Sequence, residues 1–202
     1  SRAMTGKYHE IAFTPDVLEA QQEAFGRTYA AAPAEIEPMT ATESEFIAAR
    51  DSFYMATVNQ DGWPYVQHRG GPVGFMKWLG ELSLGFADYS GNRQYLSAGN
   101  FRSDDRVALF FMDYPNRRRL KLLGRVRTVG PDELQLLARL EDSDYPAQIE
   151  RGFVIDVAGF DWNCPQHITP RFSAQEMEDK IAALRQENSR LKDLLGAAPP
   201  KA

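Results

Sequence analysis

The chain has too little cysteine and histidine for several common kinds of site. Its 202 residues include one cysteine, Cys164, and three histidines. An intrachain disulfide is therefore excluded, and the histidines lack the spacing of a metal site. A chain without disulfides suits a reducing compartment, and the N-terminus shows none of the order of a signal peptide. We expect a cytoplasmic protein without a bound metal.

Positive charge and long apolar runs are also scarce. Lys and Arg number 23 against 28 Asp and Glu, and the net charge of −5 argues against nucleic acid as a partner. No run of about 18 apolar residues is present, so no membrane span is predicted. The G-x-S-x-G, G-x-G-x-x-G and Walker motifs are missing as well. What is present is a globular composition, 43% hydrophobic and 25% charged.

Strand patterns dominate the middle of the chain. Apolar and β-branched segments predict six strands, over residues 53–58, 63–69, 81–87, 106–112, 119–129 and 152–158. The run Asn59-Gln60-Asp61-Gly62 is typical of a hairpin turn. Few helices fall between the strands, so we predict a mainly β (α+β) fold whose antiparallel sheet closes into a barrel.

Helix signals lie mostly at the two ends. The first residues predict an extended entry, and Thr14 with Pro15 predicts the start of a helix. Thr42 and Glu45 form a capping-box pattern that predicts a short helix over 43–50, and Pro131 begins another that ends near residue 141. We divide the chain into an N-terminal arm and helix (1–40), a barrel domain (41–172), a C-terminal heptad helix (173–196) and a disordered tail (197–202).

The C-terminal segment has a heptad pattern. Spacings of four and three residues connect Met177, Ile181, Leu184, Asn188, Leu191 and Leu195. Asn188 occupies an a position, where it favours a parallel, two-stranded coiled coil. Glu187 and Lys192 of two paired helices would attract each other, whereas Lys180 and Arg185 would repel. The alternative is an amphipathic helix that docks on its own domain.

Two polar segments could meet a phosphorylated, flat ligand. Gln67, His68 and Arg69 end an apolar strand just before two glycines, which would let such a ligand approach the backbone. Asn92 can cap a helix whose first N–H groups bind an anion, and Arg93 adds a planar fork suited to phosphate. The alternatives are a solvated strand end and an ordinary capped helix with an exposed arginine.

Two later segments add charge and aromatic groups. Strand alternation places Arg119 and Lys121 on one face, where a phosphate or an electron-rich ring edge would be stabilised. The arginines before them are typical of a solvated turn. Residues 160–171 combine groups that stack, donate and accept, and two prolines constrain their backbone. We interpret this last segment as functional.

In this order the phrases GWPYVQHRGG, LGFADYSGNRQY, DYPNRRRLKLLGR and DWNCPQHITPR resemble the pyridoxamine 5'-phosphate oxidase-like flavoproteins, and more narrowly their bacterial flavin-nucleotide-binding branch. The resemblance extends over about residues 7–172. It implies a six-stranded antiparallel Greek-key split β-barrel with flanking helices, to which the C-terminal amphipathic or coiled-coil helix is added. It also implies a homodimer that binds two FMN molecules in the grooves between its subunits.

The resemblance assigns the residues that would contact FMN. The strand beside the isoalloxazine ring would supply Gln67, His68, Arg69 and Gly70. The segment around the ribityl chain and phosphate would supply Ala87, Asp88, Asn92, Arg93 and Gln94, with Arg93 as the main phosphate ligand. Arg119 and Lys121 would complete this pocket. The second subunit would contribute Trp162, Asn163, His167 and Arg171.

Two departures from the vitamin oxidases bear on the substrate. Asn92-Arg93-Gln94 stands where those enzymes carry Ser-Arg-Lys, and His167 with Arg171 does not form their Arg-x-His substrate motif. Both argue against pyridoxine phosphate. The resemblance therefore implies an FMN-dependent oxidoreductase with an unidentified small-molecule substrate or electron donor and no assigned catalytic side chain. The alternatives are a flavin carrier without turnover and a deazaflavin- or haem-binding relative on the same barrel.

Overall fold

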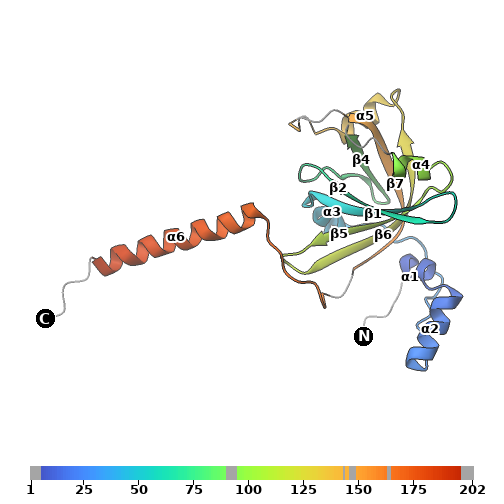
Figure 1. Cartoon of the computed structure of the whole chain (residues 1–202), viewed down its shortest axis with the longest axis horizontal. Coiled ribbons are helices and arrows are strands. Elements are labelled where there is room, and N and C mark those ends of the chain that lie inside the picture. The colour runs from blue at the N-terminus through green and yellow to red at the C-terminus, as the bar shows by residue number, and fades with distance from the viewer. Residues whose placement is uncertain (1–5, 90–94, 143, 146–148, 163–164, 197–202) are drawn as a thin grey trace. The chain divides into compact units, whose positions relative to one another are not determined.

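The strands form one antiparallel sheet in the computed structural model, which describes residues 6–89, 95–142, 144–145, 149–162 and 165–196 (Figure 1). The strands are β1 (Ser52–Val58), β2 (Pro64–Gly70), β3 (Lys77–Gly80), β4 (Ser83–Tyr89), β5 (Arg106–Asp113), β6 (Arg118–Val129) and β7 (Ile149–Trp162). The helices are α1 (Lys7–Ala12), α2 (Pro15–Phe25), α3 (Ala41–Ala48), α4 (Leu96–Asn100), α5 (Leu134–Leu140) and α6 (Ala174–Gly196). None of these described helices is long and apolar enough to cross a membrane.

The sheet has the strand order β2-β1-β5-β6-β7-β4-β3, one strand more than the sequence predicted. The additional strand, β3, has four residues and is stabilised by its pairing with β4, in which Trp78 lies opposite Leu84. The predicted turn after β1 is confirmed, because the Asn59 side-chain oxygen accepts from the N–H groups of Asp61 and Trp63. Gly62 ends this turn at a φ of 86°, which favours glycine.

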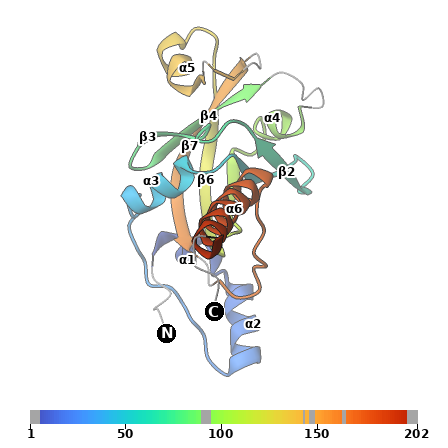
Figure 2. The same ribbon diagram turned by 90° about the vertical axis from the view of Figure 1, so that its left-hand side faces the viewer.

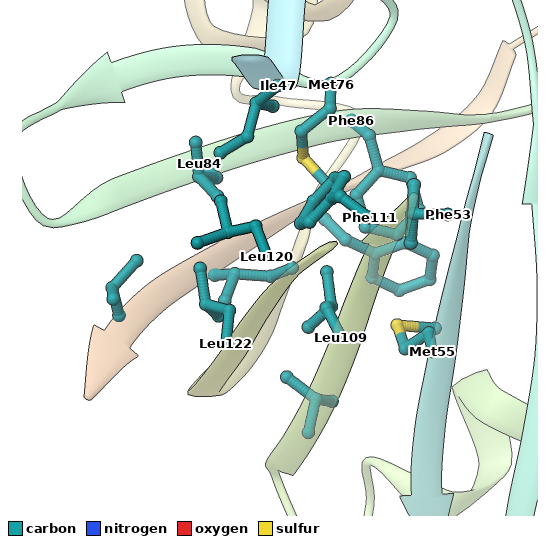
Figure 3. Packing of buried hydrophobic residues seen from close by; sticks show 14 of the residues in the cluster. Ile47, Phe53, Met55, Met76, Leu84, Phe86, Leu109, Phe111, Leu120 and Leu122 are labelled. Carbon is teal, nitrogen blue, oxygen red and sulfur yellow. The ribbon is translucent and has the colours of Figure 1, made fainter. Parts of the chain in front are cut away.

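The sheet curls around a core of aromatic side chains. Along β1 every second residue is buried, and Phe53 lies 5.2 Å from Phe86 of β4 and 5.5 Å from Phe111 of β5, between ring centroids. Figure 3 shows these rings converging. β1 and β4 are not neighbours in the sheet order, so they can share a core only if the sheet is rolled. Within the described residues β2 and β3 form no ladder, and side chains rather than backbone pairing join β2 to β4.

The start of α3 differs from the prediction. The capping box is formed by Thr40 and Glu43, so α3 begins and ends two residues before the predicted helix at 43–50. Both Thr40-Glu43 and Thr42-Glu45 fit the pattern. The first is selected because the Glu43 carboxylate also accepts a hydrogen bond from the indole of Trp162 at 2.8 Å. That contact spans 119 residues, so no local pattern reveals it.

The N-terminal segment was predicted as an extended entry, and this was wrong: residues 7–12 form α1. Its backbone lies directly against β7, since a Cβ added to Gly159 would come within 2.7 Å of the Tyr8 nitrogen. This packing against the sheet stabilises a helix too short to form by itself. The predicted start of α2 is confirmed, with the Thr14 hydroxyl accepting from the Val17 N–H.

The chain divides into two compact units. The first comprises residues 1–113 and 118–165 and contains the sheet, and the second comprises residues 114–117 and 166–202 and contains α6.

Candidate functional site

Residues of β2 alternate between the two faces of the sheet. Gln67 and Arg69 point to the inner side, whereas His68 and Gly70 are exposed on the outer side. This is the ordinary consequence of a strand's two-residue period. The first predicted group of flavin contacts is therefore divided between the inner and the outer side of the sheet.

On the inner side, Arg69 connects β2 to β4. Its Nη1 lies 2.5 Å from Oδ1 of Asp88, and the two side chains are only 11% and 7% exposed. Asp88 also forms an ion pair with Arg151, whose Nε lies 3.2 Å from Oδ2 of Asp88. The Arg69 guanidinium lies 5.6 Å from the ring centre of Phe86. One carboxylate thus balances two guanidinium groups across the opening between β2 and β4, and Nε of Arg69 has no partner in the described residues.

Two other predicted flavin contacts, Gln67 and Ala87, also have contacts within the protein. The Ser97 hydroxyl of α4 donates to Oε1 of Gln67 at 3.0 Å, which joins α4 to β2 (Figure 2). The side chain of Ala87 packs in a buried cluster with Leu140 and Val154, so only its backbone is left for a ligand. The predicted phosphate residues Asn92, Arg93 and Gln94 lie outside the described residues.

A positively charged hollow lies at this end of the sheet. It has a volume of about 660 Å³ and is lined by residues of α4, β6 and β7, by Tyr95 before α4, and by Phe101 and Arg102 after it. Three of its lining residues are arginines, Arg102, Arg127 and Arg151. Arg127 pairs with Glu133, and Arg151 pairs with Asp88 while lying over the Tyr95 ring. These arginines were not predicted as site residues, because they come from separate elements and form no motif.

The outer side of the sheet holds a second group. As predicted, Arg119 and Lys121 of β6 share one face, and the strand register places Lys121 opposite Phe110, Phe110 opposite Tyr54, and Tyr54 opposite His68. Lys121 pairs with Asp161 at 3.0 Å. Arg119 lies over the Phe110 ring, and its buried Nε has no partner in the described residues. A cation with an unused donor beside exposed aromatic surface is suited to a flat, electron-rich ligand.

Trp162 has a structural environment. Its indole nitrogen donates to Glu43, its ring meets that of Phe46 edge-on at 4.7 Å, and the Arg118 guanidinium lies 4.6 Å from its ring centre. A ligand bound through the indole nitrogen would have to replace the bond to Glu43. The other predicted flavin contacts from residues 160–171 do not share this environment. Asn163 lies outside the described residues, and His167 and Arg171 belong to the second unit. There His167 is exposed, and Arg171 lies over the Tyr114 ring.

The Glu43 carboxylate gives the fold a predictable acid sensitivity. Burial by itself raises the pKa of Glu43, but hydrogen bonds from Thr40 and Trp162 outweigh it, so this pKa lies below its usual value of 4.5. The resulting stability is present above that value and is lost as the pH falls through the folded-state pKa. Glu43→Gln should cost about 1–3 kcal/mol near neutral pH. Urea unfolding of the wild-type and Glu43→Gln proteins at several pH values should show that their difference in unfolding free energy becomes smaller in acid. A difference that stays constant with pH would contradict the role assigned to Glu43.

Comparison with known proteins identifies the family. A sequence model of the family described as pyridoxamine 5'-phosphate oxidase matches residues 39–159, which include the whole segment from α3 almost to the end of β7. This match extends over more than half of the chain. The chain therefore belongs to the pyridoxamine 5'-phosphate oxidase family. No curated protein matches it.

Solved structures give more distant likenesses. A pyridoxinephosphate oxidase family protein from Clostridium acetobutylicum is 14% identical, with 67% of this chain and 94% of that chain covered and a TM-score of 0.41. An FMN-binding protein from Syntrophomonas wolfei is 12% identical, with coverage of 60% and 82% and a TM-score of 0.46. A heme storage protein from Vibrio cholerae is 14% identical, with coverage of 60% and 91% and a TM-score of 0.40. The family assignment rests on the sequence match alone.

Proposed function

We propose that this protein binds FMN at the interface of a homodimer and acts as an FMN-dependent oxidoreductase on a small molecule. The proposal starts from family membership and from the flavin motifs in the sequence. The single structural observation that carries it is Arg119, whose buried Nε has no partner among the described residues although its guanidinium lies over Phe110. A buried donor without a partner is costly, and a bound acceptor would remove that cost.

The residues fit the chemistry of FMN. Arg119 and Lys121 supply positive charge on the outer face, next to the aromatic surface of Tyr54 and Phe110. By resemblance, Arg93 would bind the phosphate. A bound flavin supplies the transfer of a hydride or of electrons. The protein would hold it, exclude water and stabilise negative charge on the reduced ring, for which the positive charge and planar shape of an arginine such as Arg119 are suited.

A second subunit would cover the outer face. Val66 of β2 and Phe110 of β5 are 64% and 41% exposed there, and β1 lies between these strands with Ala56 opposite Val66 and Tyr54 opposite Phe110. Exposed apolar side chains on adjoining strands are typical of an association surface. Pairing through this face would also bury Arg119 further, which would strengthen its interaction with an anionic ligand.

The test is FMN binding by the full chain and by two arginine variants of the same strand. Arg119 and Arg125 both lie on the outward side of β6, but Arg125 is 61% exposed and already pairs with Asp105. Arg119→Ala should weaken FMN binding by about tenfold or more, because a charge-assisted hydrogen bond is lost. Arg125→Ala should change the dissociation constant by less than about twofold. Flavin fluorescence titrations measure the dissociation constants of both variants, and sedimentation gives the mass of each protein in solution.

The outcomes separate the alternatives. Equal effects of the two substitutions would remove Arg119 from the site, and a wild-type protein that binds neither FMN nor a deazaflavin would reject the flavin proposal. A haem absorbance band after reconstitution would indicate the haem-binding relative. Bound FMN that does not support NAD(P)H oxidation with any tested acceptor would favour the carrier over the enzyme.

A further inference from the structure

The C-terminal helix α6 is long, well defined and without buried residues. It has 23 residues, and a capping box marks its start: the Ser173 N–H donates to Glu176, and the Glu176 N–H donates to the Ser173 hydroxyl. None of its side chains is buried. A helix that remains fully exposed obtains no stability from packing against a core, which is the usual source of helix stability in proteins.

One stripe of α6 is nevertheless strongly apolar. Its exposed members, from 40% to 76% accessible, are Met177, Ile181, Leu184, Leu191 and Leu195. With Asn188 they occupy the a and d positions of successive heptads, and Ile181, Asn188 and Leu195 are the a residues. A stripe this narrow fits one partner helix rather than a broad sheet face. The heptad spacing therefore specifies the kind of partner, which is another helix of the same period.

We propose that α6 pairs with α6 of a second copy as a parallel, in-register coiled coil. The helix surface has a hollow of about 420 Å³, whose lining includes Ile181, Leu184, Arg185 and Asn188. These four residues occupy positions a, d, e and the following a. In a parallel two-stranded coiled coil, a side chain at d inserts into a hole made by four residues of the facing helix. The hollow is such a hole, and Leu184 of the second copy is its occupant.

Asn188 selects the direction and register of pairing. In a parallel, in-register pair the two Asn188 side chains meet in the same layer, where each amide can bond to the other. A shifted register would place Asn188 against a leucine or isoleucine and leave a buried amide without a partner. Such a buried polar group is unfavourable, so alternatives to the in-register pair are disfavoured.

The charges beside the stripe allow the pairing. Glu187 at g and Lys192 at the next e of the second copy attract each other, although Arg190 competes for Glu187 through hydrogen bonds of 2.6 and 2.8 Å within the helix. Lys180 at g and Arg185 at e repel. The Lys180 ammonium lies 4.0 Å from the Phe172 ring centre, a contact that draws it toward the start of the helix. Favourable and unfavourable pairs are thus equal in number, and the apolar stripe and Asn188 determine the outcome.

Cysteine cross-linking in the full chain tests the proposal. In a Cys164→Ser background, Leu184→Cys places a thiol at d, where two in-register helices bring it opposite its counterpart. Gln186→Cys places the thiol two residues away at f, on the outer side of the pair. Under mild oxidation, the 184 variant should form covalent dimer at least about tenfold faster than the 186 variant, since pairing raises the effective thiol concentration. Circular dichroism confirms that both variants keep their helix.

The outcome of this cross-linking experiment does not depend on whether the protein binds flavin. Equal rates at the two positions, or no covalent dimer at 184 in protein that sediments as a dimer, would overturn the coiled coil while leaving a dimer through the sheet intact. A second variant checks the role of Asn188. Asn188→Leu should retain association but lose the single oligomeric state, giving higher-order species in sedimentation. A strictly dimeric Asn188→Leu protein would remove Asn188 as the residue that specifies the pair.

Discussion

Replacing Phe53 with alanine will lower the free energy of unfolding by about 3–5 kcal/mol. The Phe53 ring is 1% exposed and lies at the centre of the rolled sheet, in contact with Phe75, Phe86 and Phe111. These contacts join β1 to its sheet neighbour β5 and, across the core, to β4. Within the described residues β1 and β4 form no backbone ladder, so the cavity left by the ring would weaken the side-chain packing that holds them together. Rigid strands on several sides limit how far the site can collapse, which keeps the cost high. Chemical denaturation of both proteins measures the difference.

Phe110→Ala is the matched control. Phe110 comes from the neighbouring strand β5 but faces outward and is 41% exposed. Its removal should cost the monomer no more than about 1 kcal/mol, while weakening FMN binding and dimer formation if the outer face is the proposed site. Equal losses of stability for the two substitutions would show that the sheet does not close around Phe53. A stable Phe110→Ala protein with unchanged FMN affinity would place the flavin elsewhere.

Features of the fold that depend on local sequence could be predicted, whereas those that depend on pairing with a distant segment could not. The alternation in β6 could be predicted because Leu120, Leu122 and Val126 share one face, and the structure buries these three and places Arg119, Lys121, Arg125 and Arg127 on the opposite face. Leu123 lies on that outward face, beside Gly159 and close to α1, which explains its apolar side chain. The strand β3 could not be predicted. Four residues are too few for a period, and only pairing with β4 makes them a strand.

The candidate site shows the same division. The shared face of Arg119 and Lys121 follows from a two-residue period and was predicted correctly. The division of Gln67 and Arg69 from His68 follows from that period too, but the sequence does not reveal which face is rolled inward. The partner of Arg69 was also hidden, because β2 and β4 are five places apart in the sheet order and meet only when the sheet curls. Neither Arg151 nor Ser97 belongs to a motif.

Asp88→Ala should be about as destabilising as the loss of Phe53, by about 3–5 kcal/mol, because it leaves buried positive charge unbalanced. Asp88 is the carboxylate between Arg69 and Arg151, and the Arg69 side chain is only 11% exposed. Water cannot take the place of the missing carboxylate without opening the contact between β2 and β4. The exposed pair of Asp105 and Arg125 provides the control, since Asp105→Ala should cost less than about 1 kcal/mol in the same urea titration.

A double variant distinguishes lost charge balance from lost packing. Arg69→Met combined with Asp88→Ala removes the more buried of the two arginines together with its partner, and it leaves Arg151, which is 25% exposed, able to reach solvent. The double variant should therefore be more stable than Asp88→Ala alone, because an apolar pair replaces an unpaired cation at similar volume. Additive losses would mean that Arg69 and Asp88 act separately, and the ion pair would then not hold β2 against β4. A recovered fold would also show whether FMN binding needs the Arg69 guanidinium, since the double variant lacks that group while keeping the inner face closed.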